Sequence, residues 1–168
     1  IIKAGRDPAY FTRKYAKIQH QKKGLIDFKL FQFQEDCMVD FVNHRLNVVV
    51  KARQLGMSTT VAAYAAWLAL FHKHQNIMVI ATKRATAQNF IRKVKVIIKN
   101  VPKWMMLATV VRDNQQEIEF SHGSAIKAVP TSADAGRSEA LALLIIDEAA
   151  HIENFDDLWT GLYPTIST

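Results

Sequence analysis

Three short apolar runs constrain the fold of this chain more than any other feature. Residues 46–50, 77–82 and 142–146 are rich in β-branched and other aliphatic side chains, which is typical of strands buried inside a sheet. The alanine-rich residues 60–73 and the amphipathic residues 86–100 lie between these runs and predict helices. Because strands that alternate with helices pair in parallel, the sequence predicts an α/β fold with a mainly parallel central sheet flanked by helices.

The residues before the first run predict a helical segment that precedes the sheet. Apolar side chains recur at helical spacing in residues 8–23 and again in residues 32–44. We therefore expect an N-terminal helical segment at residues 1–45 and a core domain at residues 46–168.

Charge is unevenly distributed along the chain. Residues 41–112 contain twelve Lys and Arg residues and no Asp or Glu, whereas residues 113–168 contain ten acids and two bases. A basic block of this length indicates a polyanionic partner, either nucleotide phosphates or nucleic acid. The alternative is a solvated basic face that the acidic end balances within the fold. Since no apolar stretch reaches the roughly 18 residues of a membrane-spanning helix, we expect no membrane partner.

The first apolar run leads directly into a segment that resembles a phosphate-binding loop. Such a loop needs a glycine for its turn, a lysine for the β- and γ-phosphates and a hydroxyl for Mg²⁺. Gly56 provides the turn and Ser58 or Thr59 the hydroxyl, but Met57 stands where the lysine usually follows the glycine, and a lysine occurs earlier, at Lys51. The alternative is an ordinary turn between a strand and a helix. The candidate nucleotide-binding residues of this segment are Gln54, Gly56, Met57, Ser58 and Thr59.

Two adjacent acids, Asp147 and Glu148, follow the last apolar run. In open α/β sheets, ligands bind beyond the carboxyl ends of the strands. Asp147 is suited to hold Mg²⁺ through water, and Glu148 to orient and deprotonate an attacking water. A charged strand end is the alternative. A loop of the phosphate-binding kind followed by paired acids predicts a P-loop NTPase.

Two further segments carry candidate site residues. Phe33 and Gln34 precede the loop, and an aromatic ring with a neighbouring amide can stack on an adenine and read its edge. A helix start with core aromatics is the alternative. Arg137 lies in the polar residues 132–138, where it can reach a phosphate of its own site or of a neighbour's. The alternative for Arg137 is a surface ion pair with Asp134 or Glu139.

The segment from Lys51 to Ser58, the preceding Phe33-Gln34, the strand that ends in Asp147-Glu148 and the Ala135-Gly136-Arg137 loop resemble the large terminase subunit of tailed bacteriophages, in particular the contractile-tailed type. The resemblance implies a role for each matching residue. It implies Lys51 as a displaced phosphate lysine, Arg53 as the loop arginine, Ser58 and Asp147 on Mg²⁺, Glu148 as catalytic base, Gln34 on adenine and Arg137 as an arginine finger for a neighbouring subunit. Met57 departs from members that keep lysine after the glycine, although related terminases place their lysine where Lys51 stands.

The resemblance also implies a function and partners. The family's ATPase hydrolyses ATP with Mg²⁺ to package double-stranded DNA into an empty capsid. The implied partners are double-stranded DNA, a portal protein and a small terminase subunit. On the capsid the chain is expected to form a homo-oligomeric ring. In solution a monomer is the alternative to that ring. The implied location is the host cytoplasm, and transiently the assembling capsid. A coupling motif and a nuclease domain are expected beyond residue 168, so we expect this chain to be a truncated ATPase core.

Two other functions remain open from the sequence. A helicase-like DNA translocase shares a glutamine motif, a P-loop and paired acids. A non-catalytic nucleic-acid-binding protein is the second alternative, with the loop degenerate because Met57 replaces the lysine.

Overall fold

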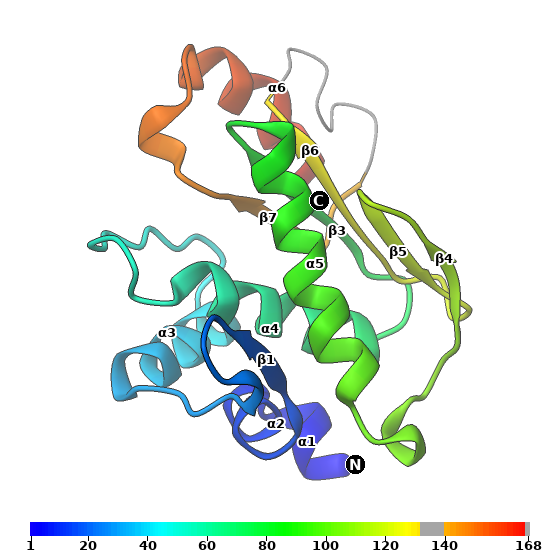
Figure 1. Cartoon of the computed structure of the whole chain (residues 1–168). Helices are drawn as coiled ribbons and strands as arrows, with labels where there is room; N and C mark the ends of the chain where they lie inside the picture. The colour runs from blue at the N-terminus through cyan, green and yellow to red at the C-terminus, as the bar shows by residue number, and fades with distance from the viewer. Residues whose placement is uncertain (132–139, 167–168) are drawn as a thin grey trace. The chain divides into compact units, whose positions relative to one another are not determined.

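The computed structural model describes residues 1–131 and 140–166, which fall into two compact units (Figure 1). We call Ile1–Leu68 with Lys93–Met106 the loop unit, and Ala69–Arg92 with Leu107–Thr168 the sheet unit. Two helices, α4 (Met57–Phe71) and α5 (Arg84–Asn100), contribute residues to both units.

The sheet unit contains a five-stranded sheet in the order β4-β5-β6-β3-β7. Its strands are β3 (Asn76–Ala81), β4 (Val110–Asp113), β5 (Glu117–Phe120), β6 (Ala125–Pro130) and β7 (Leu143–Ile146). Strand β3 pairs in parallel with β6 and with β7, whereas β5 runs antiparallel to β6 and to β4. Four of these five described strands therefore point the same way, which confirms the predicted α/β fold with a mainly parallel sheet.

The centre of the sheet is apolar because β3 has a partner strand on each side. All residues of β3 from Ile77 to Ala81 are buried. Register pairs join Ile80 to Ile146 of β7 and Ala81 to Pro130 of β6. Since parallel strands end at the same edge, this register brings the residues that follow β3, β6 and β7 to one edge of the sheet.

Helix α6 (Phe155–Ile166) covers part of this sheet with two leucines spaced four residues apart. Leu158 and Leu162 form a cluster with Met78 and Ile80 of β3 and with Leu141, which precedes β7. A short 3-10 helix, η2 (Ala149–His151), lies between β7 and α6.

The loop unit is built mainly from helices. It contains α1 (Ile2–Arg6), α2 (Pro8–Tyr15), β1 (Lys17–His20), β2 (Gly24–Asp27), α3 (Gln32–Asn43), η1 (Lys103–Met105) and the adjoining parts of α4 and α5. Local sequence starts α2, because the Asp7 side chain accepts a hydrogen bond from the Tyr10 amide at 2.8 Å and Pro8 has the φ of a first helical residue.

Helix α4 is anchored to the other helices of the loop unit through its aromatic residues. The Tyr64 hydroxyl donates to the Phe41 carbonyl of α3 at 3.1 Å, and the Trp67 indole donates to the Ala4 carbonyl of α1 at 2.8 Å. Its alanines Ala62, Ala63, Ala65 and Ala66 are fully buried, so α4 is apolar on most of its surface. Even so, neither α4 nor any other helix within residues 1–131 and 140–166 has the length and apolar character needed to cross a membrane.

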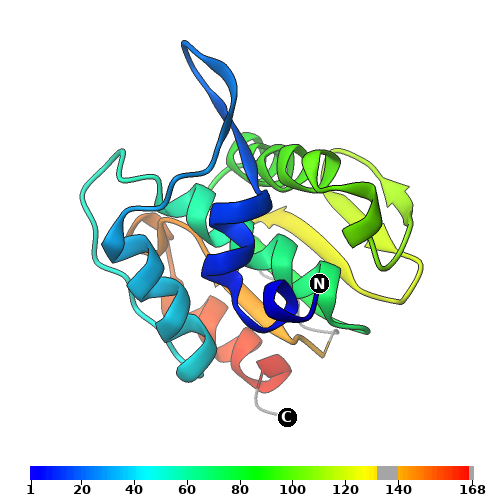
Figure 2. The ribbon, with the colours of Figure 1, turned by 90° about the horizontal axis from the view of Figure 1, so that it is seen from below.

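The prediction of one helix over residues 8–23 is wrong beyond Tyr15. Residues 17–27 form an antiparallel hairpin, in which Lys17 pairs with Asp27 and His20 with Gly24 (Figure 2). The His20 ring accepts hydrogen bonds from the Lys22 and Lys23 amides, and Gly24 adopts a φ of +70°. The left-handed Gly24 turns the chain, and the pairing of the two strands then satisfies their backbone groups. The predicted helix over residues 32–44 is confirmed as α3.

The prediction of a buried strand at residues 46–50 is also wrong. These residues form no regular element, and Val48 and Val50 are 92% and 95% exposed. A strand needs a neighbouring edge to pair its N–H and C=O groups, and none of the described strands pairs with this run. The other two apolar runs pair with each other and form β3 and β7. Strand β3 is buried as predicted, whereas β7 is half-buried because, among the described strands, it pairs only with β3.

The packing of α6 on β3 yields a stability prediction. Leu162 has no exposed surface, so Leu162→Ala removes buried methyl groups, leaves a cavity and is expected to cost about 3 kcal/mol of unfolding free energy. Leu107, which is 53% exposed in the same unit, provides the matched control, and Leu107→Ala is expected to cost less than about 1 kcal/mol. Urea unfolding followed by circular dichroism measures both, and equal midpoints would show that α6 does not stabilise the sheet.

Candidate functional site

The loop that precedes α4 turns at two residues in the left-handed region. Gln54 has a φ of +64° and Gly56 a φ of +72°, directly before the first residue of α4, Met57. The Gly56 carbonyl then accepts hydrogen bonds from the amides of Thr59 and Thr60, at 2.9 and 3.0 Å. Gly56 therefore both reverses the chain and starts the helix.

Gln34 of α3 holds this turn in place. Its side-chain oxygen accepts from the Phe31 amide at 3.0 Å, and its amide nitrogen donates to the Leu55 carbonyl at 3.0 Å. The residue is only 2% exposed, so both ends of a buried amide are hydrogen-bonded. A Cβ at position 56 would lie 2.9 Å from the Gln34 nitrogen. Gln34 thus links α3 to the loop, and its predicted contact with adenine stays a prediction.

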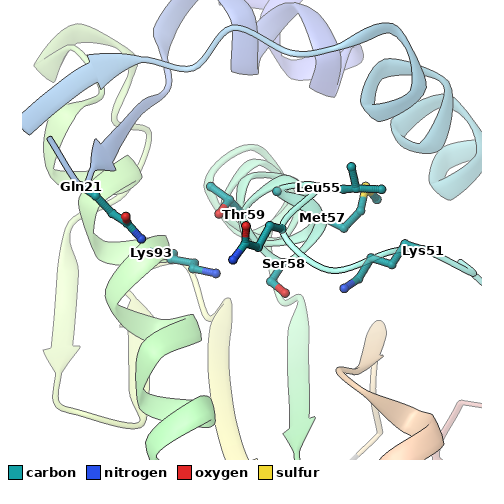
Figure 3. A pocket seen from close by; sticks show the side chains of 9 residues that line it. Gln21, Lys51, Leu55, Met57, Ser58, Thr59 and Lys93 are labelled. Carbon is teal, nitrogen blue, oxygen red and sulfur yellow. The ribbon is translucent and has the colours of Figure 1, made fainter. Parts of the chain in front are cut away.

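A pocket of about 450 Å³ lies in front of the loop, within the size range of small-molecule sites (Figure 3). It is lined by Gln21, Lys51, Gln54, Leu55, Gly56, Met57, Ser58, Thr59 and Lys93. The ammonium groups of Lys51 and Lys93 point toward the Ser58 hydroxyl from opposite sides in Figure 3. The pocket therefore joins the predicted Lys51, Ser58 and Thr59 with residues from two other segments.

The electrostatics of this pocket favour an anion. Among the described residues that line it, two are lysines and none is Asp or Glu. The pocket also lies at the N-terminus of the 15-residue helix α4, where amide N–H groups and the helix dipole attract negative charge. The amides of Thr59 and Thr60 already donate to the Gly56 carbonyl. The amides of Met57 and Ser58 come before them, in the first turn of the helix. Cations and helix amides together make a phosphate-sized anion the best-matched ligand.

The structure shows where two loop residues, Met57 and Arg53, lie relative to the pocket. Met57 is only 4% exposed, and in Figure 3 its side chain points away from Ser58 and Lys51. Arg53 is exposed and is absent from the described lining residues of the pocket. Of the two candidate loop cations, Lys51 is therefore the one that lines the pocket.

Gln21 and Lys93 were missed by the sequence analysis. Gln21 lies in the turn of the β1–β2 hairpin, which was predicted to be helical, and Lys93 lies on α5, more than thirty residues after the loop. Neither residue belongs to a motif, so no local signal in the sequence connects them to a phosphate site.

Phe33 lies near the start of α3 and is 40% exposed. Its ring stacks on that of Phe31, with centroids 5.8 Å apart and planes 7° from parallel. Neither ring is among the described residues that line the pocket. The predicted stacking of Phe33 on a nucleotide base stays a prediction.

The two predicted acids lie in the sheet unit. The Asp147 amide donates to the Ile80 carbonyl of β3 at 2.9 Å, so Asp147 directly continues the β7 pairing. Glu148 follows, exposed and in the left-handed region with a φ of 56° and a ψ of 42°. This conformation is uncommon for a residue with a long side chain and turns the chain sharply after the strand. Arg137 and its loop lie outside the described residues.

The donor set fits Mg²⁺ better than a metal caged by protein alone. No group of three or more His, Cys, Asp or Glu side chains in residues 1–131 and 140–166 is arranged to hold a metal. Mg²⁺ does not require one, since it takes oxygen ligands and is held by one or two protein groups together with water and substrate phosphates. The Ser58 hydroxyl, which lines the pocket, is an oxygen group that could serve as one of these ligands.

Comparison with known proteins gives one family and one fold. The family model described as terminase large subunit, T4likevirus-type, N-terminal, matches residues 48–167. The crystal structure of the HK97 bacteriophage large terminase superposes with a TM-score of 0.74 at 16% identity, over 96% of this chain and 35% of that chain. A mutant of the large terminase ATPase domain of Thermus phage P74-26 superposes with a TM-score of 0.65 at 18% identity, over 83% of this chain and 61% of that chain. At these identities, the likeness to the two structures is one of fold.

The close approach of Gln34 to Gly56 yields a prediction with a matched control. Gly56→Ala and Gly24→Ala both place a Cβ on a residue with φ near +70°, which costs about 1–2 kcal/mol. A Cβ at Gly24 meets nothing within 4 Å, whereas at Gly56 it meets Gln34. We therefore expect Gly56→Ala to lower the melting temperature several degrees more than Gly24→Ala.

A double-mutant cycle isolates the Gln34 contact. In a Gln34→Ala background the crowded amide is gone, so Gly56→Ala should cost no more than Gly24→Ala does there. Scanning calorimetry measures all the variants. Equal costs of Gly56→Ala with and without Gln34 would show that the contact does not shape the loop.

Proposed function

The chain belongs to the family of T4-type terminase large subunits, whose N-terminal model it matches over residues 48–167, and we propose that it is the ATP-hydrolysing part of a DNA-packaging motor. The observation that carries the proposal is the pocket at the start of α4, which is lined by Lys51, Ser58 and Thr59 and, among the described residues, by no Asp or Glu. The P74-26 relative, by its own description, is an ATPase domain. The chain spans about a third of the HK97 chain and three-fifths of the P74-26 chain, so packaging by the whole protein is part of the proposal.

The proposed chemistry is an in-line attack of water on the γ-phosphate of ATP. The loop amides and Lys51 bind the phosphates. Phe33 stacks on the adenine, and Gln34 supports the adenine side of the site through the loop that it holds at Leu55. Ser58 and Asp147 would hold Mg²⁺, which neutralises phosphate charge when it is bound. Glu148 orients the attacking water and accepts its proton. Arg53 assists at the loop, and Arg137, outside the described residues, serves the site of a neighbouring subunit.

The proposed partners follow from the family. They are double-stranded DNA, a portal protein and a small terminase subunit, in a ring on the assembling capsid within the host cytoplasm. The family match favours this motor over a helicase-like translocase. The deciding experiment measures Mg²⁺-dependent ATP hydrolysis and DNA packaging by the full-length protein with its portal and capsid. Nucleic-acid binding without any hydrolysis under these conditions would favour the non-catalytic alternative and overturn the proposal.

Lys51 is expected to be the cation of the loop. A fixed positive charge at the developing γ-phosphate charge is worth several kcal/mol, so Lys51→Ala in the full-length protein should lower ATP turnover by about 100-fold or more. Arg53 does not line the pocket, so Arg53→Ala should lower turnover much less. Steady-state hydrolysis at saturating Mg²⁺ compares the two. Normal rates for Lys51→Ala, with Arg53→Ala inactive, would assign the role to Arg53.

Glu148 is expected to act in hydrolysis and not in binding. An amide of the same size cannot accept a proton, so Glu148→Gln should retain ATP affinity within about threefold and lose at least about 100-fold in turnover. Glu153→Gln, an exposed acid five residues later, is the matched control and should leave both unchanged. Near-normal turnover by Glu148→Gln would remove Glu148 from the mechanism.

A further inference from the structure

A second lysine reaches the phosphate pocket from outside the loop. Lys93 belongs to α5, yet it lines the same pocket as Lys51, Ser58 and Thr59. In Figure 3 its ammonium points toward the Ser58 hydroxyl from the side opposite Lys51. Two cations from different elements therefore converge on the space in front of one hydroxyl.

The direction of Lys93 is fixed by the packing of α5. The buried face of this helix includes Phe90 and Ile97, which lie three residues before and four residues after Lys93 and are its neighbours on the helix surface. Lys93 is half-buried at the margin of this face, whereas Lys99 lies on the exposed side. A lysine at such a margin buries its aliphatic stem and extends its ammonium toward polar surroundings. Here those surroundings are the pocket.

The loop carries no lysine directly after its glycine. Position 57 carries methionine, which is buried and cannot bind an anion. Lys51 provides one positive charge, while the amides at the start of α4 suit the phosphates nearest the loop. A bound triphosphate brings further charge at its terminal phosphate, which a second ammonium across from Lys51 is suited to bind.

We propose that Lys93 binds the terminal phosphate of a nucleoside triphosphate in this pocket and adds a second positive charge to that of Lys51. This inference rests on the proposed ATP site and names a residue that distinguishes the triphosphate from the diphosphate. A contact to the γ-phosphate alone contributes to binding of ATP and not of ADP.

The test compares two nucleotides on the full-length protein. Calorimetric titration with Mg²⁺ uses AMP-PNP, which resists hydrolysis, and ADP. We expect Lys93→Gln to weaken AMP-PNP binding by about 10- to 100-fold, as loss of a charge-assisted hydrogen bond does, and ADP binding by less than about threefold. Lys93→Arg keeps the charge and should restore most of the AMP-PNP affinity. Lys99→Gln makes the same charge change on the exposed side of α5 and should alter neither affinity.

Three outcomes would overturn the inference. Wild-type AMP-PNP affinity in Lys93→Gln would show that Lys93 does not bind the nucleotide. Equal losses for AMP-PNP and ADP would place its effect on the shape of the pocket and not on the γ-phosphate. Failure of the unaltered protein to bind AMP-PNP would overturn the proposed function, and the role of Lys93 with it, and is distinguishable because no substitution is involved.

Discussion

The candidate site depends on the turn at Gly56, where a residue without a side chain fits against the buried amide of Gln34. The Gln34 amide accepts a hydrogen bond from the Phe31 backbone and donates one to the Leu55 backbone, so hydrogen bonds shielded from water join the start of α3 to the loop. The left-handed turn then starts α4 at Met57 and directs Ser58 and Thr59 into the pocket. Any side chain at position 56 would have to displace the link that positions the loop.

The cations of the pocket come from positions that a single motif does not contain. Lys51 lies before the turn and Lys93 lies on another helix, while Met57 is buried. A lysine has a long, flexible stem, so ammonium groups from different backbone positions can serve the same phosphate. Because Lys51 and Lys93 provide the positive charge, residue 57 at the start of α4 does not have to be a lysine and can pack in the interior. A methionine after the glycine is therefore compatible with a positively charged anion site.

The sheet unit contributes a different kind of constraint. Asp147 continues the pairing of β7 with β3, and Glu148 leaves the strand in a left-handed conformation that costs of the order of 1–3 kcal/mol in such residues. Backbone conformations of this cost persist where the surrounding structure enforces them, often at functional positions. The pairing of β7 with the buried strand β3, together with α6 packed over β3, holds the strand from which this turn leaves.

The class of the fold and the turn before α4 follow from local sequence patterns. Apolar runs at residues 77–82 and 142–146 predicted β3 and β7, and Gly56 predicted a turn before a helix, because burial and local backbone conformation are encoded by neighbouring residues. The helix was predicted to begin at residue 60, whereas α4 begins at Met57. Local patterns gave wrong predictions for two segments whose structure depends on whether a partner strand is present. Residues 46–50 have the composition of a strand but no partner strand, and residues 17–27 form a hairpin because each strand provides the other's hydrogen bonds. Only the tertiary structure brought Lys93 and Gln21 to the loop and placed Met57 in the interior, because these contacts join residues far apart in the chain through packing that no local pattern records.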